Sequence, residues 1–211
     1  MQEGYERIVV LGNSQKFIVA LGDLYPNAEI TVFPWRGCYN QRLTFAADLF
    51  VICGYDYASS TYGFRRYIAA NVAAPLAFLR KNMQSTGAQI LYINTDGPGT
   101  GLTYSRYAYA KNLLAEQLSY KYNKHTHPLR IPTVVDDSGL PQVRSGPVSR
   151  SILLTLARLG LLKTVGLSEL SGLISGALSS KEVVTPFHLG GRFLGIKRNL
   201  FVDRLLRLLG G

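Results

Sequence analysis

A tyrosine and a lysine spaced four residues apart are the side chains of this sequence best suited to acid–base chemistry. Residues 105–111 read Ser-Arg-Tyr-Ala-Tyr-Ala-Lys, which places Tyr107 four positions before Lys111. Side chains at i and i+4 lie on the same face of a helix, so the phenol and the ammonium can face one pocket. A nearby cation stabilises the phenolate and lowers the pKa of a tyrosine from its usual value of about 10. The spacing therefore predicts a proton donor and acceptor that works near neutral pH.

The same spacing also fits a structural role. Tyr104, Tyr107 and Lys111 would share one face of a helix packed on a sheet, with the lysine ammonium extended to solvent. Tyrosine is common in this sequence, with 13 copies, so such pairs arise by chance. The elements around the pair must decide between the two interpretations.

Short apolar runs alternate with helical patterns over the first 136 residues, which predicts an α/β fold with a Rossmann-like, mostly parallel sheet flanked by helices. The predicted strands are 7–12, 29–33, 48–54, 89–94 and 129–135, and the predicted helices are 15–25, 61–83 and 103–122. Ligands of such sheets bind outside the carboxyl ends of the strands. Those ends carry Gly12, Pro34 to Arg36, Gly54, Thr95, Asp96 and Asp136.

The sequence changes character after the last of these strands. We expect a loop over 136–147, amphipathic helices over 148–163 and 199–209, and a late strand over 182–189. Residues 1–136 would then form the main domain. Residues 137–211 would form a short, mainly helical C-terminal extension, packed on it at the substrate side or at an oligomer interface. The Arg and Leu pattern of 199–209 also fits a helix lying on a membrane surface, although a packed helix is its commoner use.

The composition narrows the class of protein. Hydrophobic residues make up 47% of the 211 residues and charged residues 17%, which predicts a folded globular chain. The net charge of +10 is dispersed, with no basic run of five, so we expect no nucleic-acid arm, and a nucleotide or other phosphorylated small molecule suits the charge equally well. No signal peptide and no stretch of about 18 apolar residues is present. Cys38 and Cys53 form no metal-ligand pattern, and we expect a cytoplasmic chain with a buried thiol at Cys53 and no metal.

Four segments in the same order resemble the short-chain dehydrogenase/reductase superfamily, especially its nucleotide-sugar epimerase and reductase branch. The resemblance covers about residues 6–136. The segment from Ser105 to Leu118 is similar to the active-site helix of that family, with Tyr107 and Lys111 at the catalytic positions. The other three matches are Asn71-Val72 for the helix that bears the family's asparagine, Thr95 for a strand end, and Arg130-Ile131-Pro132 for an Arg-x-Pro segment near the nicotinamide.

The resemblance implies an NAD(P)-dependent oxidoreductase or epimerase that acts on a small molecule such as a sugar nucleotide, in a chain that can form homo-oligomers. Tyr107 would exchange a proton with the substrate, and Lys111 would lower its pKa and hold the nicotinamide ribose. Thr95 would hydrogen-bond the reacting oxygen, and Asn71 would support a proton relay. The cofactor site would be lined by Gly12, Asn13, Ser14, Arg36, Gly54, Lys111 and Pro132.

The sequence departs from the family in two places. Of the family's three glycines after the first strand, which let the backbone approach a pyrophosphate, Gly12 alone remains. Residues 36–49 are also too few for the helix, strand and helix that usually follow the second strand, so the adenine pocket would be reduced or absent. Arg36 stands where an NADP-preferring relative places its 2′-phosphate contact, but a solvated loop residue is the simpler expectation. A degenerate, non-catalytic relative that acts as a binding or assembly partner is therefore the alternative function.

The remaining polar residues have plain structural interpretations. Asn71 could cap the second half of a helix broken near Pro75, and Thr95 could belong to an ordinary turn. His125 and His127 form a His-x-His pattern without an accompanying carboxylate or cysteine cluster. We expect His188 to be structural. We also expect the adjacent Asp136 and Asp137 side chains to diverge and take no catalytic role.

Overall fold

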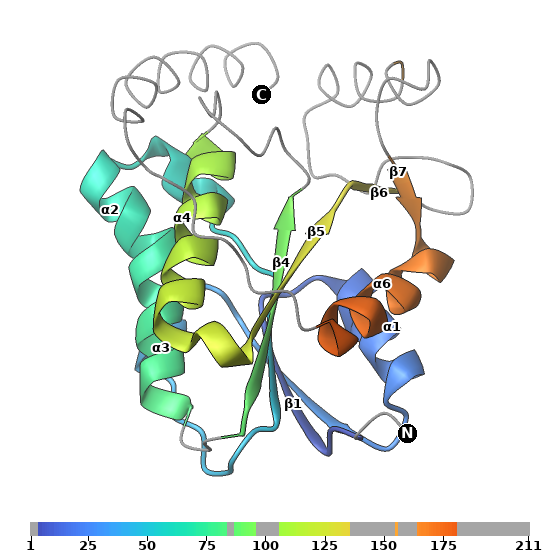
Figure 1. Ribbon diagram of the computed structural model, residues 1–211. Helices are drawn as coiled ribbons and strands as arrows, with labels where there is room; N and C mark the ends of the chain where they lie inside the picture. The colour runs from blue at the N-terminus through green and yellow to red at the C-terminus, as the bar shows by residue number, and fades with distance from the viewer. Residues whose placement is uncertain (1–3, 84–86, 96–105, 136–154, 156–163, 181–211) are drawn as a thin grey trace.

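A five-stranded parallel sheet forms the centre of the protein in the computed structural model, which describes residues 4–83, 87–95, 106–135, 155 and 164–180 (Figure 1). The strand order is β2-β1-β3-β4-β5, and every neighbouring pair is parallel. The strands are β1 (Arg7–Leu11), β2 (Glu29–Phe33), β3 (Leu49–Ile52), β4 (Gln89–Thr95) and β5 (Thr126–Ile131). This arrangement confirms the predicted Rossmann-like fold.

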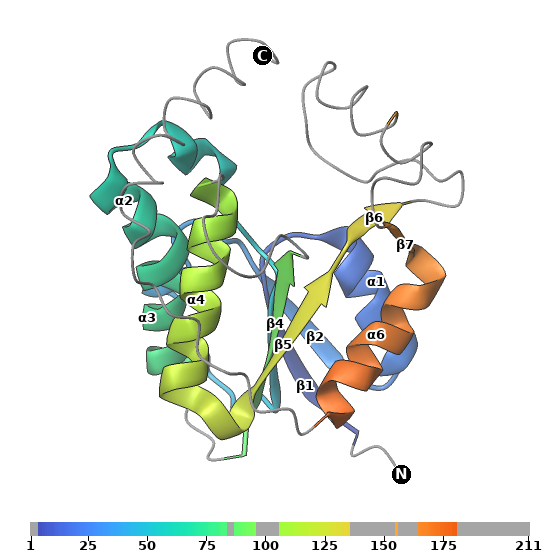
Figure 2. The same ribbon diagram turned by 45° about the horizontal axis from the view of Figure 1, so that its top comes forward.

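Helices cover both faces of the sheet (Figure 2). On one face lie α2 (Phe64–Ile68), α3 (Ala74–Asn82) and α4 (Arg106–Tyr122), with a π-helical turn at Ala69–Ala73 joining the first two. On the other face lie α1 (Gln15–Leu24) and α6 (Leu167–Ser179), which contact each other and the sheet. The chain crosses from one face to the other between β2 and β3.

The central strands β1, β3 and β4 are buried on both faces, which explains why they read as continuous apolar runs. Along β1, Val9 and Leu11 point into a core under α2, α3 and α4, whereas Ile8 and Val10 point into a second core under α1 and α6. Alternate residues of a strand face opposite sides, so a single short run supplies both cores.

The connection between β2 and β3 is as short as the sequence predicts. Its regular structure is limited to one 3₁₀ turn, Cys38–Asn40. Leu43 nevertheless fixes the connection, because its backbone N–H donates to Asn82 Oδ1 at 2.8 Å. The sheet consequently ends at β2 among the described residues.

The last predicted strand differs most from its predicted bounds. The strand predicted over 129–135 starts earlier, at Thr126, and is interrupted at Pro132. Pro128 is tolerated inside β5 because that strand lies at the sheet edge. Beyond Pro132 the chain forms β6 (Thr133–Val135), which pairs in parallel with β7 (Thr164–Gly166) in a separate two-stranded sheet.

Helix α6 was not expected. Its sequence is rich in Ser and Gly, which are weaker helix formers than Ala or Leu, so its propensity gives little signal. It is held by packing: Leu170 and Ile174, four residues apart, are fully buried in the core that it shares with α1. In the described ranges no helix is long and apolar enough to span a bilayer. The elements predicted at 136–147, 148–163, 182–189 and 199–209 fall almost entirely outside the described residues, and the domain boundary at 136 stays a prediction.

Candidate functional site

Two glycines bring the carboxyl ends of β1 and β3 close together. Gly12 has a φ of 122°, and a Cβ placed on it would lie 2.5 Å from the backbone N of Gly54. The Gly54 N–H in turn donates to the Leu11 carbonyl at 3.0 Å. Both glycines are therefore required by this close approach of two backbones.

Helix α1 begins just after this crossing. Ser14 is its N-cap residue, and its side chain does not cap the helix. Asn13 is exposed and Ser14 is half-buried. The free N–H groups of a first helical turn favour an anion, so the predicted phosphate contacts of Asn13 and Ser14 are compatible with their positions.

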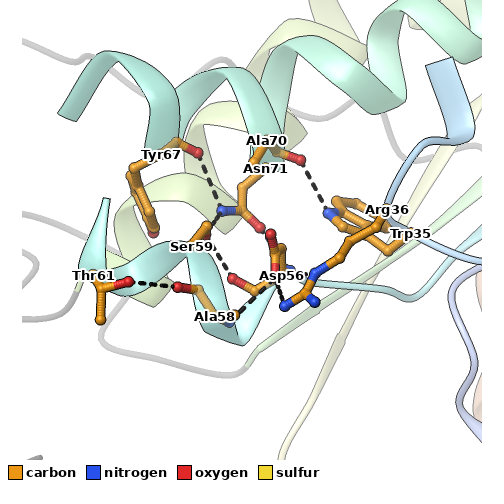
Figure 3. Close-up of polar contacts among 9 residues, drawn as sticks. All are labelled: Trp35, Arg36, Asp56, Ala58, Ser59, Thr61, Tyr67, Ala70 and Asn71. Carbon is orange, nitrogen blue, oxygen red and sulfur yellow. Dashed lines mark hydrogen bonds and ion pairs between the residues drawn. The ribbon is translucent and has the colours of Figure 1, made fainter. Parts of the chain in front are cut away.

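The indole of Trp35 lies directly on Gly54. A Cβ built on Gly54 would come within 2.2 Å of Trp35 Cε3, so only glycine leaves room for the ring. The side chain is 7% exposed, and its Nε1–H donates to the Ala70 carbonyl in the π turn at 3.1 Å (Figure 3). Sequence reasoning gave this residue no role, because an aromatic after a strand carries no marker of where its ring will lie.

Arg36 does not stand free at the end of β2. Its Nε and Nη2 both donate to Asp56 Oδ1, at 2.9 and 2.7 Å, while its side chain remains 64% exposed (Figure 3). Asp56 is 5% exposed and also accepts the Ala58 N–H at 3.1 Å. The pair ties the connection after β2 to the loop after β3, beside Trp35.

The Asn71 amide holds that loop from behind. Its Oδ1 accepts the Asp56 N–H at 2.8 Å, and its Nδ2 donates to Ser59 Oγ at 2.6 Å and to the Tyr67 carbonyl at 3.1 Å (Figure 3). The residue is 2% exposed and lies in the π turn, an irregularity that is often found at functional sites. Its amide thus positions the loop. The predicted proton relay stays a prediction.

Lys111 is buried at the carboxyl end of β4. Its Nζ donates to the Ile93 carbonyl at 2.8 Å and lies 5.1 Å from the centroid of the Tyr92 ring and 6.0 Å from that of Tyr107. Burial lowers the pKa of Lys111 from 10.5 to about 8. The expected extension of the lysine to solvent is therefore wrong, whereas its catalytic role stays a prediction.

Tyr107 lies in a cluster of tyrosines. Its ring packs edge-on against Tyr55 at 4.7 Å and stacks on Tyr57 at 6.1 Å, with an angle of 15° between the planes. Burial, and then the neighbouring Tyr57 and Tyr55, raise the pKa of Tyr107. The expected lowering of this pKa is wrong here, because the nearby ammonium is itself bound to a carbonyl and the desolvation of the phenolate dominates.

Arg106 and Tyr67 support this cluster and were missed in the sequence. Arg106 is 1% exposed; its guanidinium donates to the Tyr62 carbonyl and lies 4.1 Å above the Tyr67 ring. The Tyr67 hydroxyl donates to the Arg106 carbonyl and lies 2.8 Å from the Tyr55 hydroxyl. The sequence shows an arginine directly before Tyr107, but it does not show that this arginine is buried, and only its burial indicates its role.

The predicted site residues therefore divide into two groups along the carboxyl edge of the sheet. Gly12, Asn13, Ser14, Arg36, Gly54 and Asn71 belong to the β1 and β3 end. Tyr107, Lys111, Thr95 and Pro132 belong to the β4 and β5 end, where Thr95 pairs with Ile131 in the sheet. Cys53 lies between them as a free thiol, and burial raises its pKa to about 11.

The His-x-His pattern does not form a metal site. His127 lies in β5, with Nδ1 3.0 Å from the Ala177 carbonyl and Nε2 2.9 Å from Gln89 Oε1. Within the described part of the chain, no group of three metal-ligating side chains comes together. His127 instead links α6 to the sheet.

No protein-family model matches this sequence, and none of the curated proteins matches it. Solved structures do resemble it. The dTDP-glucose 4,6-dehydratase of Bacillus anthracis in complex with NAD superposes with a TM-score of 0.54 at 13% identity, over 84% of this chain and 73% of that one. DesIV, a dTDP-glucose 4,6-dehydratase of Streptomyces venezuelae with NAD bound, gives 0.53 at 14% identity, over 97% and 81%.

A short-chain dehydrogenase/reductase superfamily protein of Agrobacterium tumefaciens, with bound NAD, gives a TM-score of 0.50 at 13% identity, over 81% of this chain and 62% of that one. At such identities the similarity concerns the fold. The chain thus shares the Rossmann-like fold of these structures, which is the fold that the resemblance of its motifs implied.

Proposed function

We propose that this protein is an NAD(P)-dependent oxidoreductase or epimerase of the short-chain dehydrogenase/reductase type, with Tyr107 as its acid/base and a sugar nucleotide as its substrate. One observation carries the proposal: Tyr107 and Lys111 lie one helical turn apart beside the carboxyl end of β4, with the Lys111 amine fixed on Ile93. The fold supports it, since solved structures with this fold include NAD-bound dTDP-glucose dehydratases.

The described residues fit a dinucleotide at the α4 end of the site. Lys111 offers a buried amine beside the end of β4, and Pro132 directly follows β5, the neighbouring strand. The first turn of α1 offers N–H groups for a phosphate. At the β1 and β3 crossing the residues fit only once Trp35 has moved. When bound, the nicotinamide would accept or return a hydride, while the chain supplies position and electrostatics.

The acid–base step falls to Tyr107. Its raised pKa keeps the phenol protonated at neutral pH, so at rest the hydroxyl is a proton donor. Below pH 8 Lys111 carries a charge, and this charge would act on the developing phenolate as the proton leaves for a substrate oxygen, although at rest the desolvation of Tyr107 outweighs it. Tyr57, stacked on Tyr107, restricts the ring to one orientation.

Replacing Tyr107 by Phe tests this proposal. We expect turnover to fall by roughly 10²- to 10⁴-fold, the usual contribution of a positioned acid–base group, with cofactor affinity nearly unchanged. Tyr120→Phe, on the same helix but 84% exposed, is the matched control. Titration calorimetry with NADH and NADPH would measure binding, and NMR of dTDP-glucose or UDP-glucose mixtures would measure conversion. Wild-type turnover in Tyr107→Phe would eliminate this role for the tyrosine.

The Trp35 ring lies on Gly54, where β1 and β3 come together, and this favours a second function. The protein would then be a non-catalytic relative that binds a protein partner. The Trp35 ring on Gly54 and the Arg36–Asp56 pair occupy the end where the adenosine of a dinucleotide is expected. This alternative predicts no binding of either cofactor at millimolar concentration. Micromolar binding of either one would reject it.

A further inference from the structure

The strand order places a ligand crevice between β1 and β3. The connection after β1 leads through α1 to β2, on one side, whereas the connection after β3 leads through α2 and α3 to β4, on the other. In open α/β sheets ligands bind at such a reversal, outside the carboxyl ends of the strands. Gly12 and Gly54 mark that place in this protein.

A tryptophan stands where a dinucleotide fold reads the adenosine ribose. That position lies about 20 residues beyond the glycine turn and normally carries a carboxylate, or an arginine for a 2′-phosphate. Here β2 ends at Phe33, Pro34-Trp35-Arg36 follow, and no acidic residue occurs before Asp48. Trp35 turns inward and Arg36 binds Asp56, so the ribose-reading position faces the protein itself.

The indole is held in the crevice by three contacts. Its face covers Gly54, its N–H bonds to Ala70, and the Arg36–Asp56 pair closes the loop beside it (Figure 3). A planar ring on a glycine backbone, with one edge hydrogen-bonded, takes the kind of place that an adenine would need. Because the ring also packs in the core under α2, α3 and α4, a ligand must outweigh that burial as well as these contacts to displace it.

We propose that Trp35 is the residue that sets the affinity of this site for adenosine: its indole covers Gly54 beside the contact of β1 with β3 and must leave before the adenine half of a dinucleotide can enter. The inference rests on the proposed function. In this proposal the Trp35 indole competes with the adenine of the ligand within the same molecule. The nicotinamide half, next to Lys111, is not affected by that competitor.

The competition between the Trp35 indole and adenosine can be measured as a change in the apparent affinity for adenosine. The apparent affinity of a ligand is reduced by the fraction of molecules in the binding-competent state. If the indole fills the crevice in about nine of ten molecules or more, removing it tightens adenosine binding at least about tenfold. The affinity for nicotinamide mononucleotide should stay unchanged.

Trp35 is also the one tryptophan of the sequence, so its fluorescence reports its own position. The test uses the full chain with AMP, NAD⁺ and nicotinamide mononucleotide as ligands, calorimetry for affinity, and acrylamide quenching for the exposure of Trp35. Trp35→Ala empties the crevice. Trp35→Phe keeps a ring but loses the bond to Ala70, and it serves if Trp35→Ala fails to fold by circular dichroism.

We expect AMP and NAD⁺ to make Trp35 more accessible to acrylamide, and nicotinamide mononucleotide to leave it shielded. We expect AMP to bind at least about tenfold more tightly to Trp35→Ala, and by a smaller factor more tightly to Trp35→Phe. Tight binding of NAD⁺ with Trp35 still shielded, or unchanged AMP affinity in folded variants, would overturn the role of Trp35 and leave the proposed function standing. Absence of binding by all three ligands to wild type and folded variants alike would overturn both.

Discussion

The β1 and β3 end of the site differs from the β4 end in what its buried groups do. At the β1 and β3 end, the protein fills its own crevice: a ring covers Gly54, and every polar atom of the Asn71 amide that can bond is engaged. At the β4 end, titratable groups are buried with pKa values shifted away from their usual ones. The first end therefore contributes packing and hydrogen bonds to the stability of the fold, and the second holds groups whose protonation is altered by burial. Substitutions at the first should change folding most, and substitutions at the second should change pH dependence.

The largest effect on stability is expected from Gly12→Ala. The new Cβ would meet the Gly54 backbone at 2.5 Å, in a backbone conformation with φ of 122°. Strain of this kind together with a backbone clash should cost about 4 kcal/mol or more. Gly22→Ala is the control, because Gly22 lies inside α1 with open space around it, and it should stabilise by about 0.5–1 kcal/mol. Urea denaturation of both variants measures the difference. A Gly12→Ala protein as stable as wild type would show that the backbones of Gly12 and Gly54 do not approach each other closely.

Asn71→Ala should come next. It leaves the Asp56 N–H without its buried acceptor and Ser59 Oγ without its donor, at a cost of about 2–3 kcal/mol. Asn40→Ala, at an exposed position, is the control. Thermal unfolding compares the two variants. Equal midpoints would mean that the amide network does not hold the loop after β3.

Lys111 predicts a rise of stability with pH. Its pKa is about 8 in the folded protein and 10.5 when unfolded, so between these values the unfolded chain binds more protons and the free energy of unfolding increases with pH. Cys38 and Cys53 act in the opposite direction from about pH 8 upward, because their pKa values are raised from 9.0 to about 11 on folding, so the Lys111 contribution is measured as the difference between wild type and Lys111→Met. Between pH 8 and 9 that contribution is about 1 kcal/mol.

Lys111→Met should remove most of this rise. Lys16, whose pKa burial also lowers, accounts for the remainder, and the exposed Lys121→Met variant should keep the whole rise. Denaturation curves at pH 8 and 9 provide the test. If Lys111→Met retains the wild-type slope, the amine is not buried as described.

The smallest effect is expected from Arg36→Gln. The arginine is 64% exposed, and exposed ion pairs contribute little and are screened by salt. Stability should stay close to that of wild type, and the remaining difference should vanish at high ionic strength. A large loss that persists in salt would show that the pair, and not the packing of Trp35, fixes this end of the site.

Much of the fold was predictable because both of its faces are buried. Continuous apolar runs located β1, β3 and β4, whereas the assignment of Tyr107 and Lys111 to a catalytic site stays a prediction. Helix α6 was missed because tertiary packing of Leu170 and Ile174 outweighs its weak local propensity.

The finer features of the site depend on burial depth, which the sequence does not encode locally. The direction of the Tyr107 pKa shift follows from the competition between desolvation and a lysine, and the outcome depends on where the amine points. The place of Trp35 depends on a residue 19 positions later, Gly54, having no side chain. Neither is visible in the spacing of residues.

The short connection after β2 has a consequence for how copies of the chain meet. With no further strand beside it among the described residues, β2 presents an open row of backbone donors and acceptors, with Val32 39% exposed. Such rows invite edge-to-edge pairing between molecules. Here the row is five residues long and ends at Pro34, and the net charge of +10 keeps copies apart at low ionic strength. Self-association of this protein should therefore increase when salt screens that charge.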